Sequence, residues 1–238
     1  MRPGGPASKE PIYFFFDFLS PYAYLAWHSV HDVAARVGRD IEPIPVLLAA
    51  LLDAHGQKGP AEIPAKRAYV FKDALRTAHG LDLPFVPPPA HPYNPLLALR
   101  VATIGLPTRL RRDVMNALFH AAWGNGQGLD GEAAVAKALE PTGLDADVLI
   151  AEAKTPAIKE QLRADTATAV QLGVFGVPTF LAGREVFWGH DSLGHLSHYL
   201  AGADPATTGY GARLVQNWLR TPAAATRRTT PRSEAEPS

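Results

Sequence analysis

The pattern of apolar and polar positions near the start of the chain predicts a strand, a helix and a second strand. Residues 12–16 are continuously apolar, as expected for a strand that is buried on both faces. Ser20-Pro21 then predicts a helix start, with Ser20 as the N-cap and proline at the first helical position, and Gly38 ends the helix. Residues 41–46 are predicted to form a strand at the edge of the sheet, because this segment contains two prolines.

The middle of the chain, from about Leu47 to Leu172, is predicted to be mostly helical. Apolar residues recur there three and four positions apart, which is the helical period. The segments with this pattern are 65–79, 95–104, 109–123, 132–139 and 156–172. Residues 84–92 contain five prolines, so we expect a surface connection there.

Strand patterns return after this helical part. Val177–Leu181 and Glu185–Trp188 flank a short turn that contains glycine, which predicts a β-hairpin. A last helix is predicted over Asp191–Leu200, with Asp191 as its N-cap. The order β-α-β, helical insertion, β-β-α predicts an α/β fold in which helices cover a four-stranded sheet.

The length of 238 residues suits one domain with a large insertion. We expect residues 11–46 and 173–204 to form the sheet-containing domain and residues 47–172 to form the all-helical insertion. Residues 1–10 and 221–238 are predicted to be disordered tails. The second of these lacks aromatic and β-branched aliphatic side chains, and such a segment buries too little apolar surface to offset its ordering entropy.

Charge and cysteine content restrict the possible chemistry. The 23 basic and 23 acidic side chains cancel, so net charge gives no argument for a nucleic-acid or anionic membrane partner. The chain has no cysteine, which excludes disulfides, thiolate metal ligands and a protein-borne thiol nucleophile. No apolar run reaches the roughly 18 residues of a membrane span, and the N-terminus does not resemble a signal peptide, so we expect a cytoplasmic protein.

The best candidate for chemistry is the segment Asp17-Phe18-Leu19-Ser20-Pro21-Tyr22-Ala23. It places a hydroxyl at the start of a helix, directly after a buried strand, where backbone N–H groups and the helix dipole favour negative charge. Two interpretations are open. Ser20 either only caps the helix, or its hydroxyl donates to a bound thiolate or oxyanion.

Two other constellations are weaker. Asp191, His195 and His198 share one helical face and have the composition of a two-histidine, one-carboxylate metal site. They match no recognised metal motif, so we expect no metal. A serine hydrolase built on Ser20 and a histidine of the following helix is excluded. There is no Gly-x-Ser-x-Gly segment, and a helix does not direct its own side chains back at its N-cap.

Taken together, these segments resemble a known family. Residues 20–23 stand where thioredoxin-fold oxidoreductases carry Cys-Pro-x-Cys, and residues 175–180 resemble the segment that bears the cis-proline of that fold. The long helical insertion is similar to that of the DsbA-like branch. Within this branch, residues 16–22 and 187–191 resemble 2-hydroxychromene-2-carboxylate isomerases and the related kappa-class glutathione transferases. The resemblance extends over residues 12–200.

The resemblance implies that glutathione supplies the thiol that this chain lacks, and that Ser20 stabilises its thiolate. The implied reaction is isomerisation of 2-hydroxychromene-2-carboxylate or a similar unsaturated aromatic ketoacid. The implied partners are this small aromatic substrate and glutathione, in a homodimer, with no nucleic acid and no membrane. The residues implied to contact glutathione are Lys66, Asn94, Val177, Pro178, Trp188, Asp191 and Ser192. Many family members have arginine at the position of Ser192.

Each implied contact also has an ordinary structural interpretation. Asp191 is a candidate N-cap, and Asn94, which precedes a proline, is a turn residue. Lys66 is a candidate solvated helix charge, Trp188 a core aromatic residue, and Val177-Pro178 part of an edge strand. Two functional alternatives therefore stay open beside the isomerase: a kappa-like conjugating transferase, and a non-catalytic binding protein with a thioredoxin fold.

Overall fold

A computed structural model gives the structure of residues 10–222 and 224. Its centre is a four-stranded sheet with the order β2-β1-β3-β4. Strand β1 pairs in parallel with β2 and antiparallel with β3, and β3 forms an antiparallel hairpin with β4. The strands are β1 (Ile12–Phe16), β2 (Ile41–Pro45), β3 (Thr179–Ala182) and β4 (Glu185–Trp188). This architecture confirms the predicted α/β fold with a four-stranded sheet.

The central strand β1 is buried on both faces, as its aromatic sequence predicts. Phe14 stacks on Phe16, on Phe180 of β3 and on Trp27 of the first helix, with ring centroids 5.4, 5.4 and 5.8 Å apart. Phe15 faces the other side of the sheet, in a second core cluster with Leu51. Strand β2 lies at the sheet edge, as its two prolines predict.

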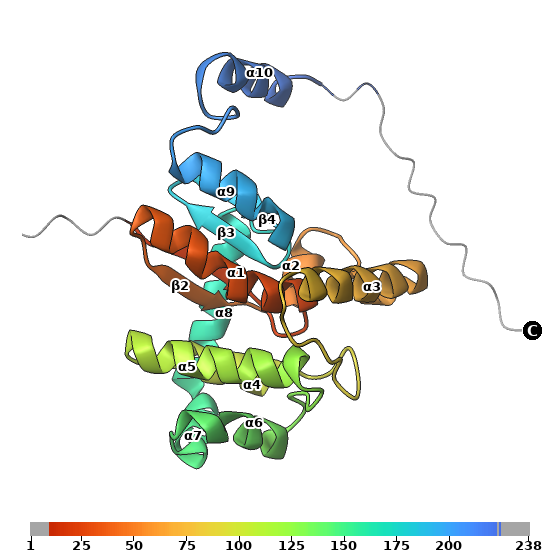
Figure 1. Cartoon of the computed structure of the whole chain (residues 1–238), viewed down its shortest axis with the longest axis vertical. Helices are drawn as coiled ribbons and strands as arrows, with labels where there is room; N and C mark the ends of the chain where they lie inside the picture. The colour runs from red at the N-terminus through yellow and green to blue at the C-terminus, as the bar shows by residue number, and fades with distance from the viewer. Residues whose placement is uncertain (1–9, 223, 225–238) are drawn as a thin grey trace, which may run out of the picture.

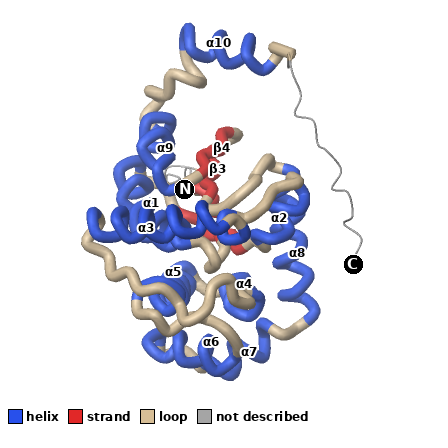
Figure 2. Tube along the Cα trace, turned by 90° about the vertical axis from the view of Figure 1, so that its right-hand side faces the viewer, coloured by secondary structure: helices blue, strands red, loops and turns tan. Residues whose placement is uncertain are grey.

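Helices cover both faces of this sheet (Figures 1 and 2). Helix α1 (Pro21–Val37) and helix α9 (Leu193–Leu200) pack against each other on one face. Helix α2 (Leu48–Ala54) packs with α8 (Pro156–Gln171) on the other face. Helix α3 contacts α1, and the remaining helices of the insertion form a group below the sheet in Figure 1. Helix α3 spans Pro64–Gly80, and the group below the sheet consists of α4 (Leu96–Thr103), α5 (Thr108–Phe119), α6 (Glu132–Leu139) and α7 (Ala146–Ala153), with a π-helical turn at His120–Gly124.

The C-terminal helix α10 (Gly209–Leu219) lies beyond α9 at one end of the molecule (Figure 1). None of its residues is buried, and Tyr210, Leu214, Trp218 and Leu219 are exposed. The two predicted tails fall almost entirely outside the described residues. No helix in the described part of the chain is both long enough and apolar enough to cross a membrane.

Two predicted boundaries around the hairpin are wrong. Strand β3 begins at Thr179 and not at Val177, because Pro178 has no N–H to give to the ladder. The last predicted helix begins at Leu193, after a 3₁₀ turn over His190–Ser192. Asp191 lies within that turn and is not the N-cap of α9. Its carboxylate makes no capping bond to the helix.

The helical insertion also differs from the prediction in places. Helices α2, α7 and α10 had no predicted counterpart, and two of them, α2 and α7, have only seven and eight residues. The proline-rich segment 84–92 is only partly a surface connection. Its Pro88 is buried, Phe85 stacks on Trp123 at 5.7 Å, and the Pro84 carbonyl accepts a hydrogen bond from Tyr24.

Candidate active site

Ser20 lies at the N-terminus of α1, immediately after the loop that leaves β1. Its side chain is 7% exposed, and its Oγ accepts a hydrogen bond from the Ala23 N–H at 3.2 Å. The predicted N-cap is therefore present, with Pro21 at the first helical position. The same hydroxyl donates to the Val177 carbonyl at 3.4 Å, at the long limit for an O–H···O bond. Ser20 is thus shared between a capping role and a contact to the opposite segment.

The segment opposite Ser20 contains the cis Val177–Pro178 bond. The Gly189 N–H donates to the Pro178 carbonyl at 2.9 Å, and the Thr179 hydroxyl donates to the Gly176 carbonyl at 2.7 Å. By contrast, the Val177 N–H has no hydrogen-bond partner among the described residues. A free backbone N–H beside a carbonyl that holds Ser20 is an open pairing edge for an extended ligand.

Asp17 is the buried carboxyl group beneath this loop and is 1% exposed. Its two oxygens accept from the Leu19 N–H at 2.9 Å and from the Leu48 N–H, at the start of α2, at 3.0 Å. Burial raises the pKa of Asp17 from its ordinary value of 3.8 to about 6, although both hydrogen bonds oppose the shift. Asp17 thereby fixes the loop that carries Ser20 to the beginning of α2.

Trp188 borders the same segment from the end of β4. Its side chain is 54% exposed and its ring lies 5.2 Å from that of Phe175. A Cβ on Gly176 would lie 2.9 Å from the Trp188 Nε1, so this glycine leaves room for the indole. Trp188 is therefore a wall on the surface beside the cis-proline and not a core residue.

Asp191 and Ser192, in the turn after β4, differ in whether their side chains are free to contact a ligand. Asp191 is exposed, and its carboxylate makes no hydrogen bond or ion pair within the described residues. Ser192 is buried, and its hydroxyl donates to the Gly189 carbonyl at 2.8 Å. The Ser192 side chain is thus used inside the turn, whereas the Asp191 carboxylate is free to meet a ligand.

Helix α3 joins the site through Tyr22, which lies two residues after Ser20. The Tyr22 hydroxyl donates to Asp73 Oδ2 at 2.7 Å. Burial, followed by the bond to Asp73 and the charges of Asp73 and Asp191, raises the pKa of Tyr22. Lys66 lies two turns earlier on α3, is exposed, and makes no ion pair in the part of the chain that the structure describes.

His91 contacts the Ser20 loop from the segment before α4, whereas the hydrogen bond of Asn94 lies within its own turn. His91 Nε2 lies 2.9 Å from the Leu19 carbonyl, and the His91–Pro92 bond is cis. Burial lowers the pKa of His91. Asn94 is exposed and its Oδ1 accepts from the Leu96 N–H at 3.1 Å, which is the turn interpretation of this residue.

No role was predicted for Asp17, Tyr22 or His91, although Asp17 and Tyr22 lie beside Ser20 and link it to α2 and α3, and His91 contacts the Ser20 loop. Asp17 carried a usable signal, because a carboxylate directly after a buried strand is costly to bury unless it has partners. No local pattern could reveal the contacts of Tyr22 and His91, since their partners lie 51 and 72 residues away.

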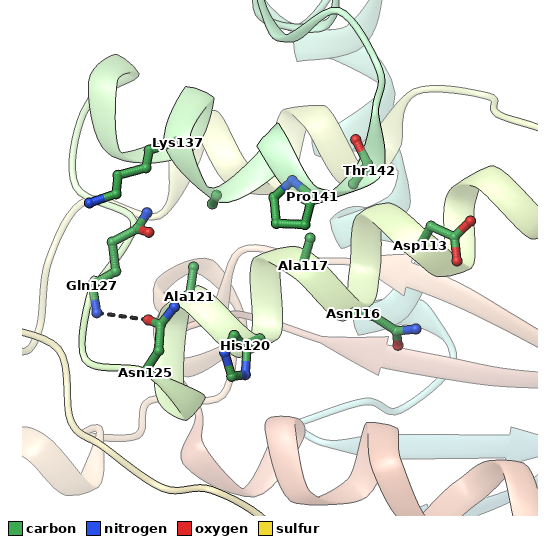
Figure 3. A pocket seen from close by; sticks show the side chains of 11 residues that line it. Asp113, Asn116, Ala117, His120, Ala121, Asn125, Gln127, Lys137, Pro141 and Thr142 are labelled. Atoms are coloured by element: carbon green, nitrogen blue, oxygen red, sulfur yellow. Dashed lines mark hydrogen bonds between the residues drawn. The ribbon is translucent and has the colours of Figure 1, made fainter.

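A surface cavity of about 490 Å³ lies elsewhere, between α5 and the segment from α6 to Thr142. Ala117, Ala121 and Pro141 lie along its centre, while Asp113 and Lys137 point away from one another at its two ends (Figure 3). Its polar groups therefore do not converge on one point. None of the predicted site residues lines it.

The metal alternative finds no support in the structure. Asp191 lies in the 3₁₀ turn and not on α9, which carries His195 and His198. The described residues contain no group of three or more histidine, cysteine, aspartate or glutamate side chains that could hold a metal ion.

The sheet order, the cis-proline and the helix start at Ser20 define a thioredoxin fold of the DsbA-like class. Residues 11–201 match the family model of the DSBA-like thioredoxin domain. A 2-hydroxychromene-2-carboxylate isomerase of Sphingobium xenophagum is 31% identical over 193 residues, which are 80% of this chain and 98% of that protein. The chain belongs to the 2-hydroxychromene-2-carboxylate isomerase family and is thus an enzyme of the isomerase type.

Structural and more distant sequence relatives agree with this assignment. A solved structure of a 2-hydroxychromene-2-carboxylate isomerase superposes with a TM-score of 0.74 at 26% identity, covering 90% of this chain and all of the other. Human glutathione S-transferase kappa 1 is 25% identical over 211 residues, which are 82% of this chain and 92% of the transferase. The resemblance drawn from the sequence motifs is therefore confirmed.

Proposed function

We propose that this protein is a glutathione-dependent isomerase of 2-hydroxychromene-2-carboxylate or of a similar unsaturated aromatic ketoacid. The observation that carries the proposal is the pairing of the Ser20 hydroxyl with Val177, whose N–H is free, at a helix N-terminus in a chain without cysteine. Family membership supplies the reaction type, and the geometry supports a thiolate brought in by a ligand.

The residues at the site fit glutathione as that ligand. When bound, glutathione supplies the thiol nucleophile, which the chain itself lacks. The helix N-terminus and one hydrogen bond from Ser20 Oγ would both favour the thiolate over the thiol. Because the bond of Ser20 to the Val177 carbonyl is 3.4 Å long, little is lost when the hydroxyl turns towards sulfur.

The groups around Ser20 fit the rest of the tripeptide. The free N–H and the carbonyl of Val177 would pair with its backbone in the manner of an added strand. The unpaired Asp191 carboxylate would accept from the γ-glutamyl ammonium, and Lys66 would meet a carboxylate. Pro178 shapes the edge and Trp188 walls it. Asn94 keeps its amide N–H₂ for a further contact, whereas Ser192 would act only through the Gly189 turn.

Binding is tested first by the melting temperature in increasing glutathione. A ligand selective for the folded state stabilises it by about 2.7 kcal/mol at a concentration a hundred times its dissociation constant. We expect the melting temperature to rise with glutathione concentration. No rise at millimolar glutathione would favour the non-catalytic binding protein.

The role of Ser20 is tested by the substitution Ser20→Ala. A hydrogen bond to a charged group is worth about 1.5–3 kcal/mol, so we expect the pKa of the bound thiol to rise by about 1–2 units. Glutathione binding measured at low pH, where the thiol is protonated, should remain near the wild-type value, while the pH–rate profile moves to higher pH. Ser197→Ala on α9, which removes a partly buried hydroxyl away from the site, is the matched control. An unmoved profile would remove Ser20 from the mechanism.

Two assays separate the isomerase from the kappa-like transferase that the human relative suggests. The isomerase converts hydroxychromene carboxylate, which is followed by its ultraviolet absorption, and glutathione is not consumed. A conjugating enzyme instead consumes glutathione with chlorodinitrobenzene. We expect the first activity to dominate, and we expect a homodimer by analytical ultracentrifugation.

A further inference from the structure

A second cavity, of about 300 Å³, lies at the far end of α1 from Ser20. It is bordered by the last turns of α1, the start of β2 and the first turns of α5. His31, which lines it, is eleven residues from Ser20 on the same helix, or about 17 Å along the helix axis. The cavity is therefore separate from the proposed glutathione site.

Three arginines from two parts of the chain line this cavity: Arg39, Arg111 and Arg112. Arg111 pairs with Glu42, and Arg39 donates to the Glu10 carbonyl at 3.3 Å, so each keeps further N–H donors. Arg112 makes no hydrogen bond or ion pair within the described residues. Asp40 is the acidic residue of the lining, so positive charge is in excess.

The position of these charges on α5 is unfavourable without an anion. Helix α5 begins at Thr108, has no side-chain N-cap and carries no acidic residue in its first turn. Arg109, Arg111 and Arg112 instead place positive charge at the end of the helix that is already positive. An anion in the cavity would offset both the unpaired N–H groups and the arginines.

His31, which also lines the cavity, has a ring nitrogen that is unpaired within the described part of the chain. Its Nε2 is buried and has no hydrogen-bond partner among the described residues, while its ring packs edge-on against Trp27 at 4.5 Å. Burial, followed by the charges of Arg112 and His28, lowers the pKa of His31 to about 4, so the ring is neutral at pH 7. A neutral ring with its proton on Nε2 donates one hydrogen bond to an anion.

The apolar residues that line the cavity favour one class of anion over another. Trp27, Ala34, Ala35, Ile41 and Pro43 make it largely apolar, with the arginines at its rim. Inorganic phosphate would engage the rim and leave the floor uncovered, whereas an apolar carboxylate would cover both. We propose that this cavity is a second binding site, for a small aromatic carboxylate held by Arg112, Arg39 and His31 over the Trp27 floor.

Benzoate is the probe, and isothermal titration calorimetry on the full chain is the measurement. We expect saturable binding with a dissociation constant of about 1 mM or tighter, unchanged by saturating glutathione. Benzyl alcohol, which has the ring without the charge, should not bind measurably. Arg112→Gln should weaken benzoate binding about tenfold, because one charge-assisted contact is lost. Arg39→Gln should act in the same direction.

Arg184→Gln is the matched control, since Arg184 is an exposed arginine in the turn between β3 and β4. Its benzoate affinity should equal that of the wild type, and Arg112→Gln should not lower the melting temperature, because it removes a positive charge from the N-terminal end of α5. In NMR spectra, the His31 ring signals should shift with benzoate. Competition between benzoate and glutathione, equal binding by Arg112→Gln, or no saturation at ten times the expected constant would each overturn the proposal. Phosphate binding more tightly than benzoate would overturn the carboxylate assignment.

Discussion

Replacing Asp17 by asparagine should change the way stability depends on pH. Asp17 is 1% exposed, and burial raises its pKa from 3.8 to about 6. One pKa unit corresponds to about 1.4 kcal/mol, so keeping Asp17 ionised in the folded protein costs about 3 kcal/mol at neutral pH. The asparagine side chain of the variant does not ionise, so this cost is absent from it.

The sign of the effect follows from proton binding. Between pH 3.8 and about 6, the folded protein holds a proton on Asp17 that the unfolded chain has already lost. The free energy of unfolding therefore falls as the pH rises through this window. About 2 of the 3 kcal/mol should be lost between about pH 4.5 and 7.5, which is a practical range for the measurement.

The assay is urea unfolding of the wild type and of Asp17→Asn at several pH values in this range. The quantity to compare is the difference between their free energies of unfolding, because the buried histidines titrate in both proteins. Asparagine can accept only one of the two bonds to Leu19 and Leu48, so the variant carries a constant offset. Asp17→Ala should show a different offset with the same pH dependence. A difference that stays flat across the range would refute the raised pKa.

Two further substitutions test the packing and the link between α1 and α3. Phe14→Ala removes a fully buried ring that stacks on three others, and should lower the free energy of unfolding by about 3–5 kcal/mol in urea unfolding; a loss below about 1 kcal/mol would contradict this packing. Tyr22→Phe removes the 2.7 Å bond to Asp73 and should cost about 1 kcal/mol. The same change in an Asp73→Ala background should cost almost nothing, and equal costs in both backgrounds would contradict the bond.

The strongest local patterns predicted the fold well. The aromatic run of β1 and the Ser20-Pro21 helix start are decided by the residues themselves, since burial and capping act within a few positions. Helix α10, by contrast, was not predicted. Its apolar residues recur at helical spacing, but none of its residues is buried, so tertiary packing does not support this helix. The short helix α2 is held by α8 and by the packing of Leu51 with Phe15 of the sheet, and α7 is held by α4, α6 and α8; local periodicity does not report such contacts.

Only those residues of the candidate site that lie within a short sequence motif could be predicted. Ser20 and the Val177–Pro178 segment stand in motifs, and the structure places them in contact. Asp191 fits the pattern of an N-cap equally well, and only the 3₁₀ turn shows that its carboxylate is free of the helix. The contact of Tyr22 with Asp73 depends on how α3 packs on α1, a property of the whole fold.

If glutathione supplies the thiol, as proposed, the position of Asp17 gives this site a property that such a ligand requires. In a protein with its own cysteine at this position, the thiol is covalently attached to the helix and keeps a fixed position relative to the helix N-terminus. With a thiol from a ligand, the loop alone would hold Ser20 in place, and Asp17 anchors this loop by accepting one N–H bond from Leu19 and one from Leu48 at the start of α2. On this proposal, the cost of burying the Asp17 charge is the cost of a loop that is ordered before glutathione binds. On the proposed function, loosening this loop should raise the glutathione concentration needed for half-maximal rate more than it lowers the maximal rate, because Ser20 is untouched once the ligand has bound.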